Sequence, residues 1–262
     1  MSLYNYNGEI IDNPYRSDAV IFQMYSDTAG AKADMQGCCT DGKYIYFAVP
    51  DRNAIYKYEI LTGTVTSATY TSGALGHANS MTYNPTTEKI YVCTMDSSGT
   101  IAVVNSSTLA VESTFVLKDS NNTAITTSGI AYDRKNNRYI ASSGNNYYFF
   151  DSSFAYVSTM AVVHPSYTFQ GLETDGEFIL RPMWDSTNNK NFIGVYDFDG
   201  NQIKLTEVPS ALEIEDVAFD WDGNYYVGIN IPSAVGWKLF YCGIREYIST
   251  NAVMTLCQIT NA

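Results

Sequence analysis

The sequence contains little histidine, few basic residues and no long apolar run. Only His77 and His164 supply imidazole rings among its 262 residues. It has no G-x-S-x-G, no H-E-x-x-H and no G-x-x-x-x-G-K-[ST] segment, so the common hydrolase, zinc-protease and nucleotide-binding motifs are absent. No apolar run approaches the roughly 20 residues that a membrane helix needs, and no secretory signal opens the chain. We therefore expect a soluble protein with no membrane insertion.

Basic residues are outnumbered, and the cysteines follow no pairing pattern. The chain has 15 Lys and Arg residues against 27 Asp and Glu residues, a formal net charge of −12. A chain this acidic repels phosphate backbones, so we expect no nucleic-acid partner. The 5 cysteines are odd in number and include no C-x-x-C. They therefore indicate neither a zinc site nor a disulfide framework, and no cofactor is predicted.

What the sequence does contain is an internal repeat. The aligned segments are MQGCCTDGKYIYFA from Met35, ANSMTYNPTTEKIYVC from Ala78, TSGIAYDRKNNRYIAS from Thr127, FQGLETDGEFILRP from Phe169 and IEDVAFDWDGNYYVGI from Ile214. The second residue of each segment is polar: Gln36, Asn79, Ser128, Gln170 and Glu215. The third is small or acidic: Gly37, Ser80, Gly129, Gly171 and Asp216. Each segment then reaches a residue that can close a short turn through its side chain: Asp41, Asn84, Asp133, Asp175 and Asp220.

Further short apolar runs follow each segment, so that most repeats hold four. Four short strands in every 40–50 residues, roughly, is the pattern of a β-propeller blade. We predict an all-β fold in which residues 1–262 form a single five-bladed β-propeller domain. Its four-stranded antiparallel blades are expected to start near residues 35, 78, 127, 169 and 214. Residues 19–26 (AVIFQMYS) are expected to complete the last blade as an N-terminal strand, with residues 252–260 (AVMTLCQIT) as the competing segment.

The polar second positions point to a candidate site. The first strand of each propeller blade lines the central channel, so these residues are expected to form one ring at its mouth. His77 lies two residues before Asn79 and is expected to face the same side. One hypothesis is that the ring binds a ligand there; the alternative is that its members bond one another, the backbone and channel water. One His with one or two carboxylates would also allow a divalent cation in the channel, although no metal-ligand set is assigned.

Two tryptophans are candidate stacking platforms for sugar rings. Trp184 and Trp237 both lie in expected loops or at strand edges, where the alternative is that each caps a blade end as a hydrophobic plug. His164, in VVHPSY, is expected at the surface. The segment Asp220-Trp221-Asp222-Gly223-Asn224 looks like a calcium loop, but its glycine comes two positions early and the closing Glu is missing. A hairpin turn is therefore expected there.

The segment GHANSMTYNPTTEKIYV, residues 76–92, resembles a five-bladed propeller of phage and prophage tail (baseplate) proteins from Gram-positive hosts. In that family the propeller is a platform that engages cell-wall glycopolymer. The resemblance implies a non-catalytic receptor-binding module, a homo-oligomer and association with a virion or prophage. The chain departs from the family in lacking an obvious long helical stem or a C-terminal tower domain.

A weaker resemblance concerns HPSYTFQGLETDGEFIL, residues 164–180. This segment is similar to the F-T-Q-G-L segment of glutaminyl cyclases, which are also five-bladed propellers. In that family a glutamate follows shortly afterwards, in an E-S-T-G motif, and serves the chemistry. The corresponding residues here read Phe178-Ile179-Leu180-Arg181-Pro182, without a glutamate.

Three functional hypotheses follow. The leading one is a non-catalytic module that binds a cell-surface carbohydrate or glycopolymer through the channel mouth and the two tryptophans. The second is a propeller enzyme, glutaminyl cyclase-like or a lyase or glycosidase, with Glu215 or Asp216 as acid or base. Its best carboxylate pair is Glu213 or Glu215 with Asp34. The third is a structural scaffold within a larger assembly.

Overall fold

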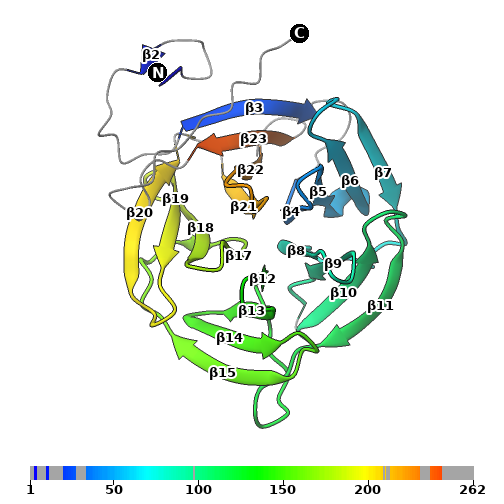
Figure 1. Ribbon diagram of the computed structural model, residues 1–262, viewed down its shortest axis with the longest axis vertical. Coiled ribbons are helices and arrows are strands. Elements are labelled where there is room, and N and C mark those ends of the chain that lie inside the picture. Colours follow the sequence, from blue (N-terminus) through cyan, green and yellow to red (C-terminus); the bar gives the residue numbers. More distant parts are fainter. Residues whose placement is uncertain are drawn as a thin grey trace.

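The computed structural model describes residues 3–4, 10–11, 20–27, 34–96, 98–208, 210, 213–230 and 237–243. The chain forms an all-β propeller whose antiparallel four-stranded blades surround a central axis (Figure 1). In each blade the strands run from the axis to the rim in turn. Among the described residues, no helix is long and apolar enough to cross a membrane.

Three blades follow the chain in simple order from axis to rim. The first contains β4 (Cys38–Thr40), β5 (Tyr44–Val49), β6 (Ala54–Glu59) and β7 (Val65–Thr69), with a 3-10 turn at Pro50–Arg52. The second contains β8 (Ser80–Asn84), β9 (Lys89–Cys93), β10 (Thr100–Asn105) and β11 (Val111–Val116). The third contains β12 (Gly129–Asp133), β13 (Arg138–Ser143), β14 (Asn146–Asp151) and β15 (Tyr156–Ala161).

The next blade has a divided inner edge. Its inner strands β16 (Thr168–Phe169) and β17 (Glu173–Thr174) both pair with β18 (Ile179–Asp185). The blade continues outward with β19 (Lys190–Tyr196) and β20 (Gln202–Val208). The interruption between β16 and β17 contains Gln170 and Gly171, so the repeated motif interrupts the strand at this point.

The remaining radial sheet joins the two ends of the chain. It contains β21 (Ile214–Phe219), β22 (Tyr225–Asn230), β23 (Trp237–Gly243) and, at the rim, β3 (Val20–Asp27). The pairing of β23 with β3 confirms that an N-terminal strand completes the last sheet. The competing segment 252–260 lies outside the described residues. A separate two-stranded sheet pairs β1 (Leu3–Tyr4) with β2 (Ile10–Ile11).

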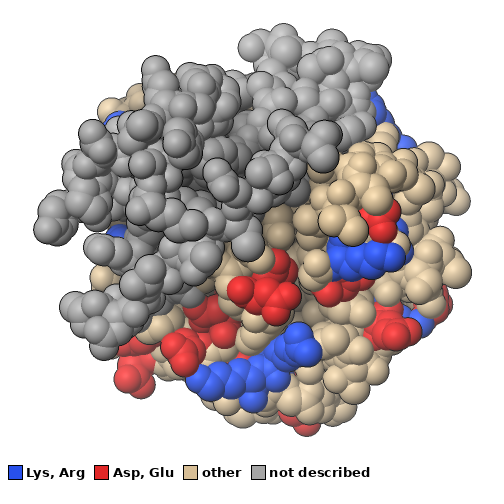
Figure 2. Space-filling view, turned by 45° about the horizontal axis from the view of Figure 1, so that its top comes forward, with Lys and Arg blue, Asp and Glu red and all other residues tan. Residues whose placement is uncertain are grey.

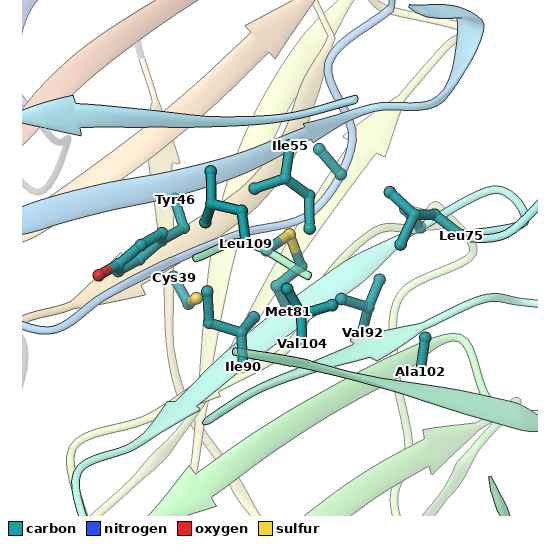
Figure 3. Packing of buried hydrophobic residues seen from close by; sticks show 12 residues of the cluster. Cys39, Tyr46, Ile55, Leu75, Met81, Ile90, Val92, Ala102, Val104 and Leu109 are labelled. Carbon is teal, nitrogen blue, oxygen red and sulfur yellow. The ribbon is translucent and has the colours of Figure 1, made fainter. Parts of the chain in front are cut away.

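Apolar side chains between neighbouring blades make the core. Figure 3 shows one such cluster, in which Tyr46 and Ile55 of the first blade meet Met81, Val92 and Val104 of the second. Alternate residues of a strand face opposite sides, so each blade presents one apolar face to each neighbour. Burying one such side chain contributes roughly 1.5–3 kcal/mol, and every blade interface repeats this packing.

The predicted side-chain-closed turns are confirmed. Asp41 Oδ1 accepts hydrogen bonds from the backbone N–H groups of Lys43 (2.9 Å) and Tyr44 (2.7 Å). Asp220 Oδ1 does the same for Asp222 and Asn224, both at 2.9 Å. Equivalent bonds are made by the other turn-opening residues: Asn84, Asp133 and Asp175. Since these turns follow the inner strands, they lie on the face opposite the start of each repeat.

Candidate functional site

The small or acidic third positions meet at the axis, where Asp216 supplies an acceptor. Asp216 is fully buried on β21, and its Oδ2 accepts the backbone N–H groups of Cys38 (2.9 Å) and Met81 (3.3 Å) on two other inner strands. Its Oδ1 accepts the N–H of Val217 at 2.9 Å. Burial raises the pKa of the Asp216 carboxyl well above its ordinary value, against these hydrogen bonds.

Ser80 plays the matching role for the other inner strands. Its Oγ accepts the N–H groups of Leu172 (3.2 Å) and Ile130 (3.3 Å). A side chain at Gly171 would overlap the Asp216 carboxylate, which explains why only a glycine fits there. Together Asp216 and Ser80 tie the inner strands to one another at this level of the axis.

The second-position residues, which we call the mouth ring, lie one residue earlier on each repeat. They are Gln36, Asn79, Ser128, Gln170 and Glu215, and all but the half-buried Ser128 are nearly fully buried. Asn79 Nδ2 donates to the carbonyl oxygen of Ser128 at 2.5 Å, linking two blades. Gln170 Nε2 donates to Glu213 Oε1 at 2.6 Å, linking two more. The ring residues therefore bond neighbouring strands, as the structural alternative expects.

Two acceptors at the ring are left without a partner. Gln36 Oε1 and Asn230 Oδ1 are buried and accept no hydrogen bond from any described residue. Asn230 Nδ2 meanwhile donates to Glu215 Oε1. A buried polar atom without a partner is uncommon and calls for a water molecule or a ligand that donates to it.

His77 and Asn79 both precede β8, so the strand alternation that was expected to place them on one face does not apply. Ala78 between them has a left-handed φ of 53°, so the two-residue alternation of a strand is broken at this point. Asn79 is buried, whereas His77 is exposed, and its backbone N–H donates to Thr94 O at 2.8 Å. Desolvation lowers the pKa of His77, while the carboxylates of Asp51 and Asp34 oppose that shift. The imidazole therefore lies beside the acidic side of the mouth.

Three carboxyl groups, Asp34, Glu213 and Glu215, affect one another's ionisation on that side. Burial raises the pKa of the half-buried Glu213, and the nearby Asp34 carboxylate adds to the increase. Burial raises the pKa of Glu215 well above its ordinary value, with further contributions from Glu213 and Asp34. The carboxylates paired in the sequence analysis, Glu213 or Glu215 with Asp34, thus act on one another electrostatically, and a raised pKa lets either glutamate hold a proton at a higher pH than a free glutamate does.

Arg181 lies beneath the other side of the mouth, and sequence reasoning did not identify it as a site residue. The residue is fully buried in β18, amid the apolar run Phe178–Trp184. Its Nη2 donates to Ser128 Oγ at 3.0 Å and its Nη1 to Ser142 Oγ, but it forms no ion pair with any described residue. Burial lowers its pKa, yet an arginine stays protonated in proteins, so this side of the site is positive.

His164 is half-buried rather than at the surface. Its Nδ1 lies 2.8 Å from the hydroxyl of Tyr196, and its ring packs against Phe169 with centroids 4.6 Å apart. Burial and the charge of Arg181 lower its pKa to about 4, so the imidazole is neutral near pH 7. His164 is therefore a packed residue beneath the mouth and carries no charge there.

Neither tryptophan expected to stack on sugars is shown to do so. Trp184 is half-buried in β18 opposite Thr168, with its indole Nε1 enclosed and without a described partner. Trp237 lies in β23, whose side chains are outside the described part of the structure. Within the described residues, no group of three or more His, Cys, Asp or Glu side chains could hold a metal ion.

The comparisons with known proteins identify a fold. No protein-family profile and no curated protein sequence matches the chain. Among solved structures, glutaminyl cyclase of Myxococcus xanthus matches with a TM-score of 0.60 at 12% identity, over 87% of this chain and 99% of that one. The calcium-binding protein regucalcin of Agrobacterium tumefaciens matches at 0.56 and 11%, over 85% and 92%. A luciferin-regenerating enzyme matches at 0.54 and 12%, over 86% and 95%.

These neighbours are β-propeller proteins, two of which are named as enzymes. Identities this low show a shared fold and leave the function of this chain to be argued from its own residues. The resemblance of residues 76–92 to phage tail propellers has no counterpart among these matches and stays a prediction.

Proposed function

We propose that this chain is a propeller enzyme that performs general acid–base catalysis at its channel mouth. The observation that carries the proposal is the group of Asp34, Glu213 and Glu215, in which burial and mutual repulsion raise the pKa of both glutamates. Closely spaced carboxyls with raised pKa values are typical of acid–base catalysts, because one can hold a proton while its neighbour is ionised.

The half-buried Glu213 is the candidate base and Glu215 the candidate acid. Glu213 is the more exposed of the two and is held by Gln170, so it can reach a substrate from a fixed position. Glu215 is anchored by Asn230, and its more strongly raised pKa favours the protonated state. Proton transfer by positioned groups of this kind contributes roughly 10²–10⁴-fold to a rate.

The charge of the mouth favours a substrate with an amino group. Asp34, Asp51 and Glu213 place negative charge beside the opening, which attracts an ammonium group. One such reaction is ring closure of an N-terminal glutamine; the Myxococcus xanthus neighbour is named a glutaminyl cyclase. The α-amino nitrogen bonds to the side-chain amide carbon, whose C–N bond breaks to release ammonia. The bound ammonium first gives one proton to water, since only the neutral amine can attack. Glu213 would take the second proton as the new C–N bond forms, and Glu215 would give one to the leaving nitrogen.

We also propose that the ring is five-bladed, with sheet β21-β22-β23-β3 as the fifth blade. Support comes from the backbone N–H groups of five equivalent residues, each of which directly follows the small or acidic third position of its repeat. All of them donate their N–H groups to Asp216 or Ser80: Cys38, Met81, Ile130, Leu172 and Val217. A repeat of this kind favours five inner strands around one axis.

Ammonia release from short N-terminal glutaminyl peptides tests the catalytic proposal. We expect release above the spontaneous rate with wild type and a loss of about 10²-fold or more in Glu213→Gln and Glu215→Gln. Glu112→Gln is the matched control, because Glu112 is exposed on the rim strand β11, where it pairs with Lys89 at 2.6 Å. Equal rates in all variants, or no release with wild type, would overturn the assignment of this reaction.

A second candidate is the non-catalytic module for a cell-surface carbohydrate or glycopolymer, in a phage-derived setting. The orphaned acceptors Gln36 Oε1 and Asn230 Oδ1 favour it, because a sugar hydroxyl could donate to them without any reaction. Thermal unfolding with cell-wall glycans separates the candidates. A ligand that binds only the folded state raises the midpoint, and mass spectrometry shows whether a product forms.

A further inference from the structure

A recess lies on the face opposite the mouth ring. It has a volume of about 420 Å³ and is lined by Arg134, Lys135, Asp175, Glu177 and Trp221. These residues come from the turns that follow the inner strands β12, β17 and β21. Each inner strand runs from the mouth ring to its turn. The recess is therefore separated from the carboxyl groups at the mouth by the length of an inner strand.

Trp221 is the aromatic residue among those that line this recess. It is half-buried, and one side of its ring packs on Phe219 with centroids 5.3 Å apart. Its φ of 65° is left-handed, a conformation that is uncommon for a bulky residue. Gly176 leaves room for the indole, since a Cβ there would lie 3.3 Å from Trp221 Cη2 and 2.7 Å from Lys135 Cβ. Two turns therefore meet at this half-buried ring, which also packs against the buried cluster that contains Phe219.

The charges around the ring balance. Two basic and two acidic side chains line the recess, and Lys135 Nζ pairs with Glu177 Oε1 at 2.9 Å. Acidic and basic side chains also lie close together on the face that Figure 2 shows. A recess without net charge gives no preference to an anion or a cation. Its exposed charged groups can hydrogen-bond to a neutral ligand that is rich in hydroxyl groups.

We propose that this recess binds a neutral saccharide, with one pyranose face stacked on Trp221. The apolar face of a pyranose carries C–H groups that pack against an indole, while its equatorial hydroxyls point outward to partners such as Glu177 and Lys135. The partner class follows from this combination of a flat ring, an open recess and balanced charge. The inference is independent of the acid–base proposal, because no residue is shared between the two sites.

Tryptophan fluorescence of the full chain, titrated with neutral tetrasaccharides, tests the inference. The probes are cellotetraose, chitotetraose, maltotetraose and mannotetraose. We expect a saturable change with at least one of them, lost in Trp221→Ala and retained in Trp184→Phe. Because Trp221→Ala also removes packing on Phe219, the exposed Glu177→Ala provides a second variant, in which we expect weakening of about fivefold or more.

Two outcomes would overturn the inference. These are no saturable change with any of the four probes, or a change that persists in Trp221→Ala. A catalytic failure of Glu215→Gln leaves this titration unaffected, so the two proposals stand or fall separately.

Discussion

Replacing Asp216 by alanine is expected to destabilise the propeller strongly, because one carboxylate serves three inner-strand N–H groups. The N–H groups of Cys38, Met81 and Val217 would each lose an acceptor in a fully buried place. A buried donor left unsatisfied costs about 1–3 kcal/mol, so we expect a loss of at least about 3 kcal/mol in the free energy of unfolding. That is a large part of the roughly 5–15 kcal/mol that stabilises a typical domain.

Asp216→Asn is the matched variant, since it keeps an acceptor oxygen and removes the charge. The pKa of Asp216 is raised in the folded state, so the folded protein binds this proton more tightly than the unfolded chain. The corresponding stability is present below the unfolded pKa and is lost as pH rises through the raised folded pKa. We therefore expect Asp216→Asn to cost less than Asp216→Ala and to reduce the loss of stability at higher pH.

Urea unfolding followed by circular dichroism measures both variants, at several pH values. The reasoning is refuted if Asp216→Ala unfolds with a free energy within about 1 kcal/mol of wild type, because the three N–H groups would then have found other acceptors. It is also refuted if Asp216→Asn and Asp216→Ala are equally destabilised, since the acceptor oxygen would then have no effect.

Three further predictions concern packing and titration. Gly171→Ala is expected to prevent folding, because its Cβ would overlap Asp216. At Gly144 a Cβ would meet nothing within 4 Å, so Gly144→Ala should reduce the free energy of unfolding by only about 1 kcal/mol, for its left-handed φ. Expression and thermal unfolding compare the two variants. His164 should titrate by proton NMR at about 4, and its stabilising contribution should disappear as pH falls through that value. Burial raises the pKa of Cys93 to about 11, so mass spectrometry should find it unalkylated until the protein unfolds.

The repeat predicted the architecture because the residues that define it, such as the turn-opening residues, act on their own local backbone. Turn-opening residues such as Asp41 and Asp220 bond their own backbone, which a sequence shows directly. The third position was recognised only as small or acidic. Its meaning depends on how closely the inner strands approach the axis, where Gly171 makes room for Asp216.

The candidate site could be predicted only in part. Glu213 or Glu215 was expected to pair with Asp34, because the last and first repeats lie on neighbouring blades if the ring closes. The alternation used to place His77 does not apply, because β8 begins only at Ser80 and Ala78 is left-handed, neither of which the sequence signals. Arg181 lies in an apolar run and Trp221 in an Asp-rich turn, so composition alone assigned them to a core strand and a hairpin.

Carbon-13 NMR titration of the glutamate carboxyl groups tests the central claim most directly. Wild type is compared with Glu213→Gln and Glu215→Gln, which assign the two resonances. We expect both glutamates to titrate above their ordinary pKa, and we expect the pKa of Glu215 to fall when Glu213 is neutralised, because repulsion between them contributes to the increase. If both groups titrate near the ordinary value of about 4.3, the mouth holds no poised acid, and the proposed acid–base site is contradicted.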